Sequence, residues 1–173
     1  MNVDITRFDI GAVEPLWLEE RAEIDIIVPP EARITAPLSV LHLHGSLDGS
    51  TYDSLVSIAQ QELTAGIRQI VIDLENAQSI SNAGIVGLYM VAALLGGKSL
   101  DKLEGHEIVH QMRRAIEMEE RCPGLILAAP AEGMSRALAS CGLEHIVSIL
   151  PSVNEAISAF PEDWTIGEDT ALL

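Results

Sequence analysis

Apolar positions recur every second residue in some stretches of the chain and every third or fourth residue in others, which predicts interleaved strands and helices. Short apolar runs, rich in β-branched residues, predict strands at 39–44, 70–74, 125–129 and 146–150. Amphipathic or wholly apolar stretches predict helices at 51–65, from 82 to the glycine pair at 96–97, and at 100–120, 132–140 and 153–160. Gly142 is expected to close the helix at 132–140, and the residues from Ser152 to Glu155 match a capping box that opens the last helix. This alternation predicts a layered α/β domain with a largely parallel sheet.

The segment from 74 to 90 is the one around which the other elements are expected to pack. An apolar strand leads into a polar loop, which ends in Ser81-Asn82-Ala83-Gly84 and is followed by an almost wholly apolar helix. Asn82 is predicted to be the N-cap, and Gly84 and Gly87 are predicted to let the helix lie close to the sheet. The helix start exposes N–H groups and a partial positive charge, which suit an anion or an acidic group of a partner. We expect the functional surface there.

Composition narrows the class of partner. The chain has 173 residues and a net charge of −16, with 26 acidic against 10 basic residues, so nucleic acid is an unfavourable partner. The longest apolar run, 85–95, is too short to span a bilayer, and the first residues lack a signal-peptide pattern. Cys122 and Cys141 show neither disulfide nor metal spacing and are expected to be reduced thiols in a cytoplasmic protein.

Three segments together resemble the STAS domain, the family of sulfate transporters and anti-sigma factor antagonists. They are VLHLHGSLDGST at 40–51, IVIDLENAQSISNAGIVGLYM at 70–90, and the order of elements over 125–160, with its Gly142-Leu143 and Glu155-Ala156 pairs. The resemblance implies a STAS-like domain over 35–160, a mixed, mostly parallel sheet flanked by helices. Within it, 96–122 is expected to be an inserted helical segment after the central helix. Residues 1–34 are expected to form an acidic arm packed on the domain, and 161–173 an acidic tail.

The resemblance also implies a function, that of a regulatory binding module and not of an enzyme, with no cofactor. The implied partner is an anti-sigma factor or a serine kinase of the histidine-kinase-like ATPase type, and a homodimer is compatible with the pattern. The residues expected to contact the partner are Asp48, Thr51, Ser81, Asn82, Ala83, Gly84 and Leu88.

One of these residues departs from the family pattern. Aligning Gly84 with the family glycine places Ala83 at the serine that family members phosphorylate, and alanine has no hydroxyl to accept phosphate. Ser79 and Ser81 lie nearby but do not occupy the matching position. Because a phosphate would add a charge of about −1.5 to −2 at the interface, this chain is expected to lack that switch.

The segment His106-Glu107-Ile108-Val109-His110 matches the H-E-x-x-H pattern, which is the alternative from another functional class. On a helix the two histidines would lie one turn apart and could share a zinc ion, with Glu107 as general base of a hydrolase. A third protein ligand is required and none stands out; Glu117, Glu119, Glu120 and His145 are merely possible candidates. We favour the simpler interpretation, a solvated face of an amphipathic helix.

Two further polar features have structural interpretations. His42 and His44 point to the same face of the strand at 39–44, where a hydrogen-bonded structural role is favoured over a ligand role. Asp48 is suited either to capping the helix that follows or to the rim of the partner surface. No nucleotide-binding glycine loop and no G-x-S-x-G elbow occurs in the sequence.

Overall fold

The computed structural model describes residues 2–8, 37–100 and 105–160. Its strands are β1 (Asn2–Phe8), β2 (Leu38–Leu47), β3 (Gln69–Asp73), β4 (Ala77–Ile80), β5 (Leu125–Ala128) and β6 (Ser148–Leu150). Its helices are α1 (Tyr52–Thr64), α2 (Asn82–Leu95), α3 (Gly105–Glu117), α4 (Glu132–Ser140) and α5 (Val153–Ser158), with a 3-10 turn, η1, at Leu143–His145.

Five strands form the main path of the sheet, in the order β1-β2-β3-β5-β6. The pairs β2–β3, β3–β5 and β5–β6 are parallel, and β1 pairs with β2 antiparallel, with Asn2 opposite His44 and Phe8 opposite Leu38. The short strand β4 lies off this path and pairs in parallel with the second half of β2. The sheet is therefore mixed and mostly parallel, as expected.

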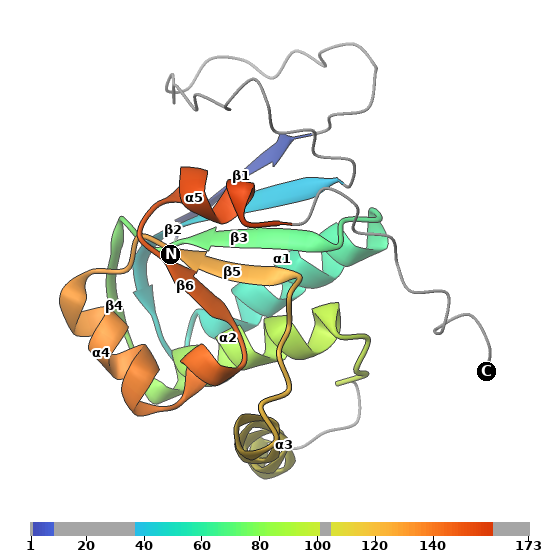
Figure 1. The fold of residues 1–173 in the computed structure, drawn as a ribbon, viewed down its shortest axis with the longest axis vertical. Coiled ribbons are helices and arrows are strands. Elements are labelled where there is room, and N and C mark those ends of the chain that lie inside the picture. Colours follow the sequence, from blue (N-terminus) through green and yellow to red (C-terminus); the bar gives the residue numbers. More distant parts are fainter. Residues whose placement is uncertain (1, 9–36, 101–104, 161–173) are drawn as a thin grey trace.

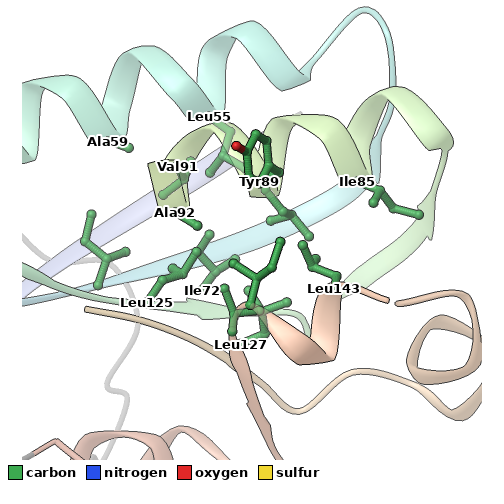
Figure 2. Packing of buried hydrophobic residues seen from close by; sticks show 14 of the residues in the cluster. Leu55, Ala59, Ile72, Ile85, Tyr89, Val91, Ala92, Leu125, Leu127 and Leu143 are labelled. Atoms are coloured by element: carbon green, nitrogen blue, oxygen red, sulfur yellow. The ribbon is translucent and has the colours of Figure 1, made fainter. Parts of the chain in front are cut away.

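Helices cover both faces of the sheet (Figure 1). The larger core packs α1, α2 and α4 against one face, and Figure 2 shows Ile72, Leu125 and Leu127 of the sheet beneath α2. The smaller core lies under α5 on the other face and contains Val40, Val71, Ile126, Ala156 and Ile157, with Leu38, Ala128 and Phe160 completing it. Helix α3 packs on α2 and so forms an additional outer layer.

Most of the elements read from the sequence are confirmed to within a few residues. The Ser152 half of the capping box is confirmed, because the Ser152 Oγ accepts a hydrogen bond from the Glu155 N–H at 3.2 Å at the start of α5. The Glu155 carboxylate accepts from the Ser152 hydroxyl at 3.4 Å. Gly142, expected to close α4, has a φ of +77°, which glycine adopts without strain. The helix expected over 100–120 is described as α3, and residues 101–104 lie outside the described part of the chain.

Two strands, β1 and β4, were missed. The loop expected at 75–80 contains β4, whose residues Ser79 and Ile80 pair with Ser46 and Leu47 of β2. Most of the arm at 1–34 and the whole tail at 161–173 lie outside the described residues. Of the arm, only β1 is described, and it forms one edge of the sheet.

Candidate functional site at the start of α2

The start of α2 is fixed at the end of β2 by the way in which β2 changes partner. Its first half, from Leu38 to His42, pairs with β3, and its residues from Gly45 to Leu47 pair with β4, with a register shift between Gly45 and Ser46. The chain leaves β4 directly into α2, and the Ser81 N–H donates to the Leu47 carbonyl oxygen at 3.0 Å. The first turn of α2 therefore lies against the last residue of β2.

Gly84 makes this close approach possible. A Cβ atom at Gly84 would lie 2.2 Å from the Leu47 carbonyl oxygen and 3.0 Å from a side-chain carbon of Ile80. Only a residue without a side chain fits, as predicted. Gly87 is different, since a Cβ atom there would lie 2.8 Å from the Tyr52 Cβ. That glycine lets α2 approach α1, so the prediction that it faces the sheet is wrong.

Ser81, and not Asn82, is the N-cap of α2. The Ser81 backbone is extended, and its hydroxyl accepts a hydrogen bond from the Gly84 N–H at 3.3 Å. Asn82 is the first helical residue and its side chain is exposed. Helix geometry leaves the N–H groups of Asn82 and Ala83 without an acceptor inside the helix. These two donors face the outside at the positive end of the α2 dipole.

The turn from Asp48 to Thr51 is held by its own hydrogen bonds. The Asp48 carboxylate accepts from the Ser50 hydroxyl at 2.7 Å and from the Ser50 N–H at 2.8 Å. The Thr51 hydroxyl donates to the Ser46 carbonyl at 3.0 Å and accepts from the Asp48 N–H at 2.9 Å. The Ser50 side-chain and backbone hydrogen bonds hold the pKa of Asp48 below its ordinary value. Asp48 is thus ionised in a fixed position.

Asp48 does not cap α1. The N-cap position belongs to Thr51, whose side chain makes no capping hydrogen bond. The capping interpretation of Asp48 is wrong, because its carboxylate folds onto Ser50 instead. The rim interpretation of Asp48 stays a prediction about binding.

The turn at 48–51 and the first turn of α2 lie next to each other in space. A Cβ atom built on Gly49 would be 3.9 Å from the Ala83 Cβ, which is ordinary van der Waals contact. Beside this contact the Ser79 hydroxyl donates to the Ser46 hydroxyl at 2.8 Å. Sequence reasoning missed Ser46, Gly49 and Ser50, because their role depends on the pairing of β4 with β2.

Two of the residues expected to contact a partner are buried. The Leu88 side chain is 0 % exposed and belongs to the core, so its assignment to the contact surface is wrong. Leu88 lies more than one turn into α2, on the side that faces inward. Gly84 is also buried, against Leu47, and acts by allowing the close approach.

We use the term docking surface for the accessible surface that the turn at 48–51 and the start of α2 form together. It carries one carboxylate, several hydroxyls, the small side chain of Ala83 and two outward N–H groups, and its residues are Asp48, Gly49, Ser50, Thr51, Ser81, Asn82 and Ala83. Such a surface is suited to close contact with another protein, because little side-chain bulk separates the two backbones. These described residues include no nucleophile–base pair.

Of the two histidines on β2, His42 has a structural role. The buried His42 contributes its Nδ1 to a 2.8 Å hydrogen bond with Asp73 on the neighbouring strand β3. Burial alone would raise the pKa of Asp73, but the hydrogen bonds from His42 and from the Glu75 N–H outweigh burial and lower that pKa. The prediction of a hydrogen-bonded structural role is confirmed for His42.

The H-E-x-x-H segment lies on α3. His106, Glu107 and His110 are exposed, and Ile108 faces the core. Within residues 2–8, 37–100 and 105–160 no group of three histidine, cysteine or acidic side chains is placed to hold a metal ion. The structure therefore gives the zinc-hydrolase alternative no support.

The layered sheet, the capped start of α2 beside the end of β2, and the order of elements define an α/β domain with the STAS-like fold. Among solved structures, the chain is similar to TM1081 from Thermotoga maritima, a candidate anti-sigma factor antagonist. Its crystal structure matches with a TM-score of 0.52 at 17 % identity, over 71 % of this chain and 86 % of that one. Its NMR structure matches with a TM-score of 0.50 at 14 % identity, over 84 % and 95 %.

An anti-sigma factor antagonist from Mycobacterium paratuberculosis is also similar, with a TM-score of 0.49 at 20 % identity over 71 % of this chain and 85 % of that one. The fold assignment depends on the two TM1081 structures. At the level of sequence, no protein-family model and no curated protein matches the chain. The fold expected from the resemblance is thus confirmed by structure.

Among the described residues, no helix combines the length and the apolar character that crossing a membrane requires.

Proposed function

We propose that the protein is a regulatory binding module, not an enzyme, that docks an anti-sigma factor or a serine kinase of the histidine-kinase-like ATPase type on its docking surface. Binding would sequester that partner and release its client, such as a sigma factor. The observation that carries the proposal is the contact between the Asp48–Thr51 turn and the first turn of α2, near Gly49 and Ala83. The fold shared with a candidate anti-sigma factor antagonist supports the same conclusion.

The chemistry of the docking surface explains how a partner would be held. The N–H groups of Asn82 and Ala83 suit carbonyl or carboxylate oxygens of the partner. The ionised Asp48 would face a lysine or arginine and favour a cationic rim on that partner. The small side chains at 49, 50 and 83 allow the partner backbone to come close.

We further propose that the protein binds constitutively, without a phosphate switch at position 83. Ala83 is the second residue of α2 and offers a methyl group where a serine would offer a hydroxyl. Phosphate at that position would place about two negative charges beside the Asp48 carboxylate. Without it, control must come from partner levels or from another residue.

The test is titration calorimetry with a purified anti-sigma factor or serine kinase from the same organism. Ala83→Asp is expected to weaken binding at least about tenfold, because it adds charge and bulk at the centre of the interface. The same change favours the helix dipole at the start of α2, so a loss of binding would not come from unfolding. Ala65→Asp is the matched control, because it adds the same charge at the other end of α1, roughly 20 Å away.

A second arm tests the phosphate claim. With the kinase and ATP, Ala83→Ser is expected to gain phosphate at residue 83, and the wild-type chain none between 79 and 84, as read by peptide mass spectrometry. Phosphate on Ser79 or Ser81 of the wild-type chain would contradict constitutive binding. Equal affinities of wild type and Ala83→Asp would contradict the location of the docking surface.

A further inference from the structure

An open pocket of about 810 Å³ lies at the opposite end of α2, well separated from the docking surface. Its walls come from the last turns of α2, from α3 and from the segment that leads into β5. Most of them are apolar, and they include Ala92, Ala93, Leu95, Ala115 and Ile146. A volume of this size is in the range that holds small ligands.

A buried hydroxyl without a partner lines this pocket. The Tyr89 side chain is 1 % exposed, and its oxygen has no hydrogen-bond partner within the described chain. In Figure 2 that oxygen points away from the labelled side chains of β3 and β5. Burial is the main cause that raises the pKa of Tyr89, while the charge on Lys98 lowers it and that on Glu120 raises it. Tyr89, Lys98 and Glu120 all line this pocket. A buried, unpaired hydroxyl costs stability, so a ligand that accepts its hydrogen bond would be favoured.

The charge of the pocket is opposite to that of the chain. Arg68, Lys98 and Arg121 line it, three of the ten basic residues, against a single acidic residue, Glu120. The Lys98 ammonium donates to the Glu120 carboxylate at 2.6 Å, and both side chains are partly exposed at the pocket. In a protein with a net charge of −16 this is a local positive site.

The structure also limits the charge of a ligand. The pocket is beside the carboxyl-terminal end of α2, whose carbonyl groups carry partial negative charge. That end disfavours a doubly charged phosphate but tolerates a single charge held by an ammonium and a hydroxyl. Cys122 also lines the pocket, and burial raises the pKa of its thiol, so it stays protonated and adds no nucleophile.

We propose that this pocket binds a small amphipathic monocarboxylate, with its apolar body against α2 and α3 and its carboxylate between the Tyr89 hydroxyl and the Lys98 ammonium. On binding, the carboxylate competes with Glu120 for Lys98.

The test uses three probes with the same chain length, which are octanoate, octanol and octylammonium. Titrations followed by amide chemical shifts are expected to move residues 89–99 and 115–124. Octanoate is expected to bind at least about tenfold more tightly than octanol, because only its charged carboxylate forms a charge-assisted hydrogen bond with the Lys98 ammonium, and octylammonium is expected to bind most weakly, because it cannot accept a hydrogen bond and is repelled by Lys98. Equal affinities, shifts confined to other residues, or no shift at millimolar octanoate would overturn the proposal.

Variants separate a ligand site from a merely structural cluster. Tyr89→Phe is expected to raise the melting temperature of the free protein, because it removes a buried unpaired hydroxyl, and to weaken octanoate binding about tenfold. Tyr52→Phe, the only other tyrosine position in the chain, is the matched control and should leave binding unchanged.

Substitutions of Lys98 and of Glu120 are expected to change the affinity for octanoate in opposite directions. Lys98→Gln should weaken octanoate binding, and Glu120→Gln should tighten it, since it frees the ammonium. Arg136→Gln removes a basic residue from an exposed ion pair with Glu132 on α4 and is the control for lost charge. If Lys98→Gln and Glu120→Gln changed the affinity in the same direction, the carboxylate would not contact Lys98.

Discussion

The two ends of α2 differ in packing and in charge. At its amino-terminal end, backbone lies against backbone, since Gly84 meets the Leu47 carbonyl and Ser81 closes the first turn. At its carboxyl-terminal end, an open apolar pocket is bordered by the exposed ion pair of Lys98 and Glu120. The first end presents a firm surface of small residues, and the second a concave space with basic side chains. The proposed protein contact and the proposed ligand site thus lie at opposite ends of the same buried helix.

This difference predicts that substitutions at the amino-terminal end cost folding stability and that those at the carboxyl-terminal end change ligand binding instead. The largest effect is expected for Gly84→Ala. The added methyl group would overlap the Leu47 carbonyl oxygen, which is backbone and cannot move away cheaply. We expect a loss of about 3 kcal/mol or more in the free energy of unfolding, measured by urea denaturation.

Gly133→Ala is the control for Gly84→Ala. Gly133 is in α4, and no atom lies within 4 Å of the place that an added methyl group would take, so the change should be neutral or stabilise the protein by roughly 0.5 kcal/mol. A loss below about 1 kcal/mol at Gly84 would mean that the start of α2 is not packed as tightly as described.

The next largest effect on stability is expected where the paired part of β2 and β3 ends, at His42 and Asp73. Asp73→Asn removes the carboxylate that holds His42, and we expect a loss of about 1–3 kcal/mol near neutral pH. Because the folded pKa of Asp73 is lowered, its contribution is present above the unfolded pKa and is lost as pH falls from about 4 through the folded value.

Urea denaturation as a function of pH checks this prediction. The wild-type stability should decrease more steeply below pH about 4 than that of Asp73→Asn. Asp53→Asn, an exposed carboxylate on α1, is the matched control. If the free energies of unfolding of wild type and Asp73→Asn decreased in parallel below pH about 4, the His42–Asp73 pair would not stabilise the contact between β2 and β3.

A smaller effect is expected for Ser81→Ala, which removes the N-cap of α2. The loss should be about 1 kcal/mol, and Ser152→Ala should lose a similar amount at α5, where the cap geometry is the same. Ser57→Ala, exposed within α1, should lose nothing. If Ser81→Ala were as neutral as Ser57→Ala, the first turn of α2 would not depend on its cap.

The smallest effect on stability is expected for Lys98→Gln. The Glu120 carboxylate raises the pKa of Lys98 through its hydrogen bond, but both side chains are partly exposed and the pair is screened by solvent. The urea midpoint should be nearly unchanged in the absence of octanoate. A large decrease would mean that this end of α2 is as firmly packed as the other end.

Local patterns in the sequence were sufficient for the elements whose signals are local. The N-cap at Ser152 and the end of α4 before Gly142 follow from a few neighbouring residues, and both are found as expected. Gly84 was also placed correctly, because an apolar helix that starts next to a strand needs a small residue at the contact. The Asp48 and Ala83 segments lie next to each other in the structure, a proximity that was implied only by the resemblance, and their role in binding stays a prediction.

The predictions that were wrong concern features that depend on contacts between residues distant in the sequence. Ser81 and Asn82 are both good capping residues, and the choice between them depends on where β4 ends. β4 itself is four residues long with two exposed side chains, and only its pairing with the distant β2 makes it a strand. Leu88 was misplaced because an all-apolar helix does not reveal which of its faces is covered.

The change of partner along β2 has a structural consequence. From Gly45 onward β2 pairs with β4 and no longer with β3, so the turn at 48–51 follows a short two-stranded ladder that runs past the central strands. The hydrogen bonds that position this turn against the first turn of α2 are therefore those of β4 and of the Ser81 N–H to the Leu47 carbonyl, and not those of the central strands.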